Sequence, residues 1–457
     1  MSAQIDLDKV AAYANSVQAE YESNLKTFVD IASVSMEPER KKEIDTAAEF
    51  GKKLLEQSGA KAKVVETKGY PVVTGEFFHS KDVPTVTIYN HLDVQPADAS
   101  EWKHAPFNMH IENGVYYGRG TTDDKGPALS VLYAARYAHD HGIPVNIKVI
   151  WELEEEIGSP SFEQFLKDNI KDLATDSVVI SDTIWVSRER PAIPYGLRGL
   201  QGCLLKLKTG IKDVHSGTTG GLARNPIGEL AQLISLCYNA TTGEVLFPGF
   251  YDDANPVDED ELDNFVKSGF TVANFKKAHE LGSTRTEDAR EGAARIWGRP
   301  TFEVHGITGG YTGPGVKTIV PNQAEAKVSM RLVPNQDPDR IVEALRKFVA
   351  AHAPDVELVR EGSLKPFLGH FRGPFAEAAK GAMKSAFGVE PAFTREGGSI
   401  GAVVSMQETM DVPIVFLGLS LPEHGYHAIN ENFDWQQASG GIRMFVDYFE
   451  RVSKITR

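Results

Sequence analysis

Hydrophobic positions in residues 1–182 switch between helical and strand-like spacing. Apolar residues recur about every 3.6 positions over 7–33 and 40–58, and further helices are expected at 127–142 and 161–169. Strand-like runs occupy 72–78, 85–90, 145–152 and 177–182. Strands that alternate with helices predict an α/β fold with a mostly parallel sheet and helices on both faces.

The pattern changes near Gly196. The run LQGCLLKLKT alternates as a strand does, and residues 324–333 alternate strictly between apolar and polar positions. Two further strands are expected at 302–306 and 356–360, and two helices at 226–239 and 338–352. This β-α-β-β-α-β order predicts a ferredoxin-like α+β unit, a small sheet with helices on one face.

The alternating α/β pattern returns after Pro374, with a helix to Phe387 and a strand near 413–418. A chain that leaves one pattern and later resumes it predicts one domain inserted into another. We therefore expect a first domain made of residues 1–196 and 371–457, interrupted by a second domain at residues 197–370.

Composition narrows the class of protein. At 457 residues the chain is too long for one hydrophobic core. Its 63 acidic and 48 basic residues give a formal charge of −15, which argues against nucleic acid or an anionic membrane as the main partner. Two cysteines, Cys203 and Cys237, lack metal or redox spacing and are expected to be buried and inert. With neither a signal-peptide pattern nor a long apolar run, we expect a cytoplasmic protein.

Candidate chemistry begins at His91 and Asp93, which end the strand-like run in the stretch IYNHLDVQP. A carboxylate beside an imidazole can hold the tautomer that a metal-bound histidine needs. A His-x-Asp sequence alone is more often a loop feature than a metal site. The interpretation therefore depends on further ligands.

Acids and histidines follow four other stretches, where sites gather in open α/β sheets. They are Asp123 and Asp124, the cluster Glu152, Glu154, Glu155 and Glu156, then Asp182, and His424 with His427. Each alone is ordinarily a turn former, a cap or a solvated face. Together they favour two zinc or manganese ions that share a bridging carboxylate. Such a site also needs an unligated carboxylate as base, and the adjacent pair Glu155 and Glu156 supplies one base and one ligand.

Ten motifs, in order, give the chain a family resemblance. They are HLDVQP, GRGTTDDKGP, EEIGS, ISD, YGLRG, DVHSG, GVKTIVP, SMRLVPN, TREGGSI and HAINE. The chain resembles the co-catalytic metallopeptidases related to acetylornithine deacetylase and succinyl-diaminopimelate desuccinylase, and within them the cytosolic nonspecific dipeptidase (carnosine dipeptidase) branch. Asn90 and Leu92 depart from the usual glycine and tyrosine beside the histidine.

The resemblance implies a role for each metal-site residue. His91 and Asp182 would bind one ion, Glu156 and His427 the other, and Asp123 would bridge both with a cis peptide to Asp124. Asp93 would orient His91. Glu155 would be the general base that activates the bridging water and then protonates the leaving amine. His424 is expected not to be a ligand, and Asn430 is either a support for the His427 loop or a simple turn former.

The resemblance also implies a substrate site shared between two subunits. His215, on the inserted lid and dimerisation domain, would reach across a homodimer to stabilise the oxyanion. Arg331 would clamp the substrate carboxylate, with Thr318 and Ser399 nearby.

The main hypothesis is thus a dipeptidase with two zinc, manganese or cobalt ions, acting on small peptides with a free C-terminal carboxylate. An N-acyl-amino-acid deacylase or carboxypeptidase with the same site is the nearest alternative, and a non-catalytic binding protein is the alternative of another class.

Overall fold

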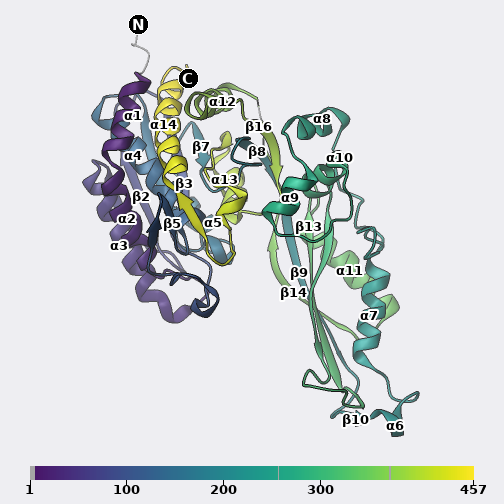
Figure 1. Ribbon diagram of the computed structural model, residues 1–457. Coiled ribbons are helices and arrows are strands. Elements are labelled where there is room, and N and C mark those ends of the chain that lie inside the picture. Colours follow the sequence, from purple (N-terminus) through teal and green to yellow (C-terminus); the bar gives the residue numbers. More distant parts are fainter. Residues whose placement is uncertain (1–5, 256, 370–371, 457) are drawn as a thin grey trace.

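The computed structural model describes residues 6–255, 257–369 and 372–456, which form two units (Figure 1). The first unit contains a six-stranded sheet in the order β1-β2-β6-β3-β7-β17. Its strands are β1 (Lys61–Val65), β2 (Val72–Phe77), β3 (Thr85–His91), β6 (Asn146–Glu152), β7 (Ser177–Ile180) and β17 (Ile414–Phe416). The four strands from β6 to β17 are parallel, whereas β1 and β2 pair antiparallel. The central strand β3 is buried along its whole length, so its last residue, His91, lies inside the protein.

Helices cover both faces of this sheet. Alternate residues of β3 point to opposite sides, and Ile88 packs in one apolar cluster while Tyr89 packs in another. The larger cluster includes residues of α1 (Leu7–Ser16), α2 (Gln18–Asp30), α3 (Lys41–Gln57), α4 (Gly126–Asp140), α12 (Pro374–Phe387) and α14 (Trp435–Val452). The smaller one includes α5 (Phe162–Asn169) and α13 (Gly401–Met410).

The second unit contains a four-stranded antiparallel sheet in the order β11-β13-β9-β14. Its elements follow one another as β9 (Gly199–Lys208), α7 (Pro226–Cys237), β11 (Thr301–Gly309), β13 (Gln323–Leu332), α11 (Pro338–His352) and β14 (Glu357–Leu364). Residues of α7 and α11 share one core with the sheet, which includes the two free cysteines. At the end of this unit that lies far from the first unit are β10 (Val214–His215), β12 (Ile319–Val320) and α6 (Ser216–Thr219) (Figure 1).

Smaller elements connect and flank the two units. One three-stranded sheet combines β15 (Phe367–Leu368), β8 (Ala192–Leu197) and β16 (Ala392–Glu396), and another combines β18 (Asn432–Asp434), β5 (Val115–Tyr117) and β4 (His110–Glu112). Three short helices, α8 (Glu259–Lys267), α9 (Val272–Ala278) and α10 (Ala289–Ala293), contribute to a core of their own. The single-turn segments are η1 (Pro38–Arg40), η2 (Ala99–Glu101), η3 (Thr121–Lys125), η4 (Glu155–Ile157), η5 (Ala294–Gly298) and η6 (Pro422–His424).

Two features differ from the expected pattern. The helix expected over 7–33 is divided at Val17 into α1 and α2, which keep apolar residues on the same buried side. The main sheet has two antiparallel pairings at one edge, β1 with β2 and β2 with β6, and the lysines of the edge strand β1 are exposed. None of the helices in the described ranges combines the length and the apolar character needed to cross a membrane.

Candidate metal centre

His91 ends β3 with one ring nitrogen committed and the other available. Its Nδ1 lies 3.0 Å from the main-chain oxygen of Asp93. Its Nε2 lies 2.9 Å from Oδ1 of Asp123 and 3.8 Å from Oδ2 of Asp182. With Nδ1 donating to the backbone carbonyl, Nε2 is the ring nitrogen that faces the carboxylates and would be the one available to a metal ion.

The Asp93 carboxylate forms its hydrogen bonds with groups other than the His91 ring. Its Oδ1 is 3.5 Å from the His91 ring, longer than a hydrogen bond should be. It accepts hydrogen bonds from the backbone N–H groups of Glu155 (3.2 Å) and Glu156 (3.0 Å), and from the Ser35 hydroxyl (2.7 Å). Asp93 therefore fixes the turn that presents the two glutamates, and it is the Asp93 main chain that orients the histidine.

Asp123 belongs to η3, and its carboxylate lies between the side chains of His91 and His427. The peptide bond from Asp123 to Asp124 is cis. Oδ1 faces His91, and Oδ2 lies 3.2 Å from Nε2 of His427. One carboxylate thus points an oxygen toward each of two candidate ligands, as a bridging carboxylate must. The neighbouring Asp124 accepts a 2.8 Å hydrogen bond from Asn90, which gives the unusual asparagine before His91 a structural use.

The backbone around Asp123 is held by Glu431, which the sequence reasoning did not single out. This buried carboxylate accepts hydrogen bonds from the N–H groups of Gly120 (2.9 Å), Thr122 (3.0 Å) and Asp123 (3.1 Å). It also receives Arg119 at 2.8 Å. The motif HAINE contained the signal, because a glutamate four residues after His427 can reach back across the site.

The four-glutamate stretch after β6 divides into two structural and two site residues. Glu152 accepts a 2.6 Å hydrogen bond from Tyr89, and Glu154 accepts from the backbone of Tyr70 and Ser161. Glu155 and Glu156 begin η4, which ends at Gly158 with a φ of +86° that glycine adopts readily. This tight turn directs both side chains toward the cluster around Asp123.

Glu156 and Asp182 each keep part of the carboxylate free. Oε2 of Glu156 lies 3.3 Å from His427 and accepts from Gln95 at 2.6 Å. Its Oε1 is buried and has no hydrogen-bond partner among the described residues, a costly arrangement unless a cation or water takes it. Asp182, two residues beyond β7, accepts from the Tyr426 hydroxyl at 3.0 Å and leaves Oδ2 toward His91.

Five side chains thus form two overlapping ligand groups, called here the metal cluster. His91, Asp123 and Asp182 form one group, and Asp123, Glu156 and His427 form the other. Within each group the candidate ligand atoms lie within 4.8 Å of one another. His427 is the exposed member, at 58% of its side chain, and sits on a loop with a φ of +55°. Mixed imidazole and carboxylate donors fit zinc, manganese or cobalt.

The electrostatics of the metal cluster favour added positive charge. Burial raises the pKa of Glu156 to about 7 and that of Asp182 to about 6. Hydrogen bonds to Asp123 and Glu156 raise the pKa of His427 to about 11. Without ions, protons must therefore neutralise this site, and divalent cations would displace them.

His424 has a different role. It is buried, its Nε2 lies 3.2 Å from Oδ2 of Asp434, and its Nδ1 accepts from the backbone of Leu421 at 3.1 Å. It belongs to neither ligand group of the metal cluster. Asn430 accepts a 2.7 Å hydrogen bond from the backbone of Lys103 and so ties down the loop that carries His427.

The four expected substrate-binding residues lie in two separate pairs. Arg331, in β13, donates to the Ser399 hydroxyl at 3.0 Å, and Ser399 also hydrogen-bonds the Arg198 carbonyl. Burial lowers the pKa of the Arg331 guanidinium. His215 and Thr318 are exposed and adjacent at the far end of the second unit, where Ser216 donates to the Thr318 carbonyl at 2.9 Å (Figure 1). Within one chain the structure does not bring these two pairs together.

Comparison with known proteins finds relatives that match nearly the whole chain. The model of Peptidase family M20/M25/M40 matches residues 87–451. The Beta-Ala-His dipeptidase of Homo sapiens is 31% identical over 98% of this chain and 93% of the human protein.

Two solved structures also match in three dimensions. The di-peptidase Dug1p from Saccharomyces cerevisiae is 28% identical, with a TM-score of 0.88 and 99% of each chain covered. The M20 family metallo-carboxypeptidase Sso-CP2 from Sulfolobus solfataricus is 33% identical, with a TM-score of 0.88 over 95% of this chain and 100% of the other. Both units of the fold therefore have counterparts in proteins of this kind.

Proposed function

This chain belongs to peptidase family M20/M25/M40, and on that premise we propose that it is a two-metal dipeptidase. It is a metallopeptidase, a hydrolase that cleaves the peptide bond of dipeptides or small peptides with a free C-terminal carboxylate. The observation that carries the proposal is the pair of ligand groups that share Asp123, with Glu155 beside them.

The metal cluster would hold two ions. His91, Asp123 and Asp182 would hold one, and Asp123, Glu156 and His427 the other, with zinc, manganese or cobalt as the candidates. When bound, two such ions polarise a carbonyl and lower the pKa of a water molecule between them. The orphaned Oε1 of Glu156 and the raised pKa values of the buried carboxyl groups support this use.

Glu155 is proposed as the general base. Its backbone is held by Asp93, and burial, with the repulsion of Glu156 and Asp182, raises the pKa of its carboxyl. A carboxylate with a raised pKa takes a proton from the attacking water more readily and can return it to the leaving amine. Because Glu155 belongs to neither ligand group of the metal cluster, it would be free for this transfer while Glu156 acts as a ligand.

Arg331 and Ser399 are proposed to bind the C-terminal carboxylate of the substrate. A guanidinium matches the two oxygens of a carboxylate, and Arg331 forms no ion pair among the residues that the structure describes. Its partial burial makes the missing countercharge costly, which favours an anionic ligand there.

The second unit is proposed as an inserted lid and dimerisation domain, residues 197–370, between catalytic segments 1–196 and 371–457. Its far end exposes Ile211 at 94%, Leu222 at 92% and Val316 at 93%, which is unusual for large apolar side chains unless a partner covers them. In a homodimer, His215 and Thr318 of one subunit would complete the substrate site of the other. We further propose a cytoplasmic location, in keeping with two free buried thiols.

A carboxypeptidase or N-acyl-amino-acid deacylase activity is the second candidate, favoured by the identity of 33% with a metallo-carboxypeptidase. Kinetics on a matched panel separate the three activities. A free-amine dipeptide should be cleaved, its N-acetyl analogue and a longer peptide should be cleaved much more slowly, and chelation should abolish turnover. Preference for the acetylated substrate or the longer peptide would overturn the dipeptidase assignment, and turnover that survives metal removal would overturn the whole proposal.

A further inference from the structure

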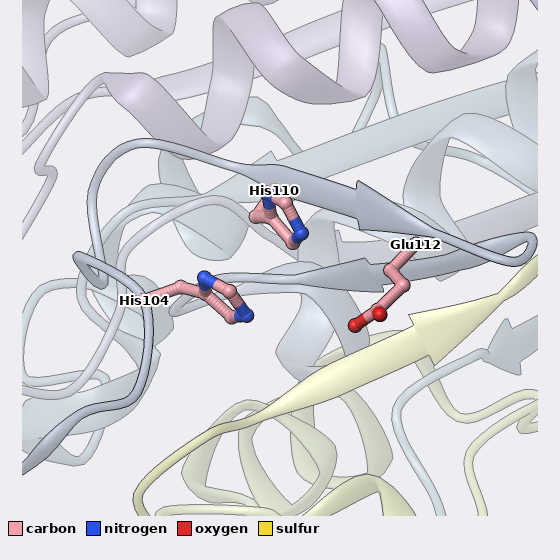
Figure 2. Close-up of side chains that lie close together, drawn as sticks. All are labelled: His104, His110 and Glu112. Carbon is pink, nitrogen blue, oxygen red and sulfur yellow. The ribbon is translucent and has the colours of Figure 1, made fainter.

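A second group of imidazole and carboxylate side chains lies at the surface of the first unit (Figure 2). His104, His110 and Glu112 each offer a ligand atom, and these atoms lie within 4.8 Å of one another. None of the three belongs to the metal cluster, and the proposed hydrolytic function does not use them.

The backbone places two of these side chains on one face without help from a ligand. His110 and Glu112 are two residues apart in β4, so they project on the same side of the strand. Asn113 and Gly114, with φ values of +54° and +77°, connect β4 to β5 in the manner of a tight two-residue hairpin. The pairing of Glu112 with Val115 and of His110 with Tyr117 then fixes the register.

His104 reaches the same face from the loop after η2. Its ring stacks on that of His110, with 3.9 Å between centroids and 15° between planes, and Figure 2 shows the Glu112 carboxylate beside the two rings. Nε2 of His104 is buried and has no hydrogen-bond partner in the described part of the chain. Desolvation, together with the nearby His110 and Lys103, lowers the pKa of His104, which favours the neutral imidazole that can ligate a metal.

Lys103 would compete only weakly with a metal ion for the Glu112 carboxylate. Its Oε2 lies 3.8 Å from Nζ of Lys103, and both side chains are largely exposed. Exposed ion pairs contribute little free energy, so a cation with better geometry can displace the lysine. The His110 ring is exposed and its last torsion is soft, so the ring can adjust its direction toward the same ion as His104.

We propose that His104, His110 and Glu112 form a third metal site, separate from the metal cluster, that binds a zinc-class divalent ion. Two imidazoles and one carboxylate are a zinc donor set, and solvent would complete the coordination at this open surface. The site is braced by the loop that carries His427, because Lys103 donates to Asn430 and β5 pairs with β18 beyond that loop.

Zinc binding to the whole protein tests the proposal. Metal-free protein is titrated with Zn²⁺ at neutral pH by equilibrium dialysis, and a third, weaker equivalent is expected after the first two. His110→Ala or His104→Ala should weaken only that equivalent by about tenfold or more. His79→Ala removes another exposed histidine, one that belongs to no ligand group, and should leave all three equivalents unchanged.

A further variant distinguishes a metal site from a merely structural cluster. Lys103→Ala removes the competing cation but keeps the backbone bond to Asn430, so it should tighten the third equivalent. Absence of a third equivalent in the unaltered protein overturns the proposal, as does a third equivalent that survives both histidine variants. Because the first two equivalents appear on the same isotherm, failure of the third site is distinguishable from failure of the proposed function.

Discussion

The metal cluster and the substrate-binding residues are assembled in opposite ways. The five members of the cluster come from one unit, and their contacts with one another span 2.9 to 3.8 Å. The substrate-binding residues lie instead at the two ends of β13, where Arg331 is near the first unit and Gln323 is near the tip with His215. Eight positions of strand separate these ends, roughly 27 Å. One chain thus contains the proposed hydrolytic groups but only part of the proposed recognition site.

Removing the base is expected to have the largest effect. Glu155→Gln keeps the shape and the backbone bonds to Asp93 but cannot take a proton, so kcat should fall by about 10²–10⁴-fold. Binding of two metal ions, measured by equilibrium dialysis, should be nearly unchanged. Glu163→Gln, the same substitution on the exposed side of α5, is the matched control and should retain full activity. Retained turnover in Glu155→Gln would remove this residue from the mechanism.

The division of the substrate site predicts complementation between two inactive variants. His215→Ala should lower kcat by about 10²–10³-fold, as expected for the loss of one oxyanion donor. Mixing it with Glu155→Gln gives hybrid dimers in which one site has Glu155 from one subunit and His215 from the other. Activity of up to half that of the unaltered dimer should return.

That mixing experiment also tests the opposite arrangement. If His215 reached the metal cluster of its own chain by closure of the second unit, each site in the hybrid would lack one of the two groups. No activity would then return, and the two-subunit site would be refuted. Size-exclusion chromatography of the mixture establishes that hybrids formed.

Arg331→Lys tests the part of the recognition site that one chain does hold. Lysine keeps the charge but loses the planar fork, so KM for a dipeptide should rise about 10–100-fold, as expected for one or two lost charge-assisted hydrogen bonds. The effect on kcat should be smaller. Arg360→Lys, in β14 of the same sheet, is the control and should leave KM unchanged. An unchanged KM in Arg331→Lys would mean that the substrate carboxylate binds elsewhere.

The sequence predicted which side chains lie together in the proposed metal cluster better than it predicted how the proposed recognition site is assembled, for a physical reason. Buried parallel strands leave a strong apolar signal, and the polar residues that follow them must gather at one sheet edge, as His91, Glu156 and Asp182 do. The family resemblance is confirmed, and with it the metallopeptidase class. Whether His215 meets Arg331 in its own chain or in another depends on the assembly, about which local periodicity carries no information.

Other features were missed because their signal is not periodic. Glu431 holds three backbone N–H groups around Asp123, but an acid in a loop looks like any solvated turn. Asn90 departs from the family motif, and the sequence alone does not indicate its hydrogen bond to Asp124. The helix α14 was not predicted, although its buried face includes Ile442 and Phe445, because two adjacent glycines, Gly440 and Gly441, weaken its helical signal.

The smallest expected effect concerns the stability of the metal-free protein. Glu156, with a pKa of about 7 against an ordinary value of 4.5, and Asp182, with about 6 against 3.8, hold protons when folded that the unfolded chain has lost. His427, with a pKa of about 11, also binds its proton more tightly when folded. All three make the folded state bind more protons, so stability should fall as pH rises from about 5 to 8.

Thermal unfolding of chelated protein across that range measures this slope, which metal should remove because bound cations replace the protons. Glu156→Gln should flatten the slope of the metal-free protein, since glutamine does not titrate. His215→Ala, at the far end of the second unit, should leave it unchanged. If the chelated protein instead gains stability toward pH 8, the metal cluster does not bind excess protons when folded.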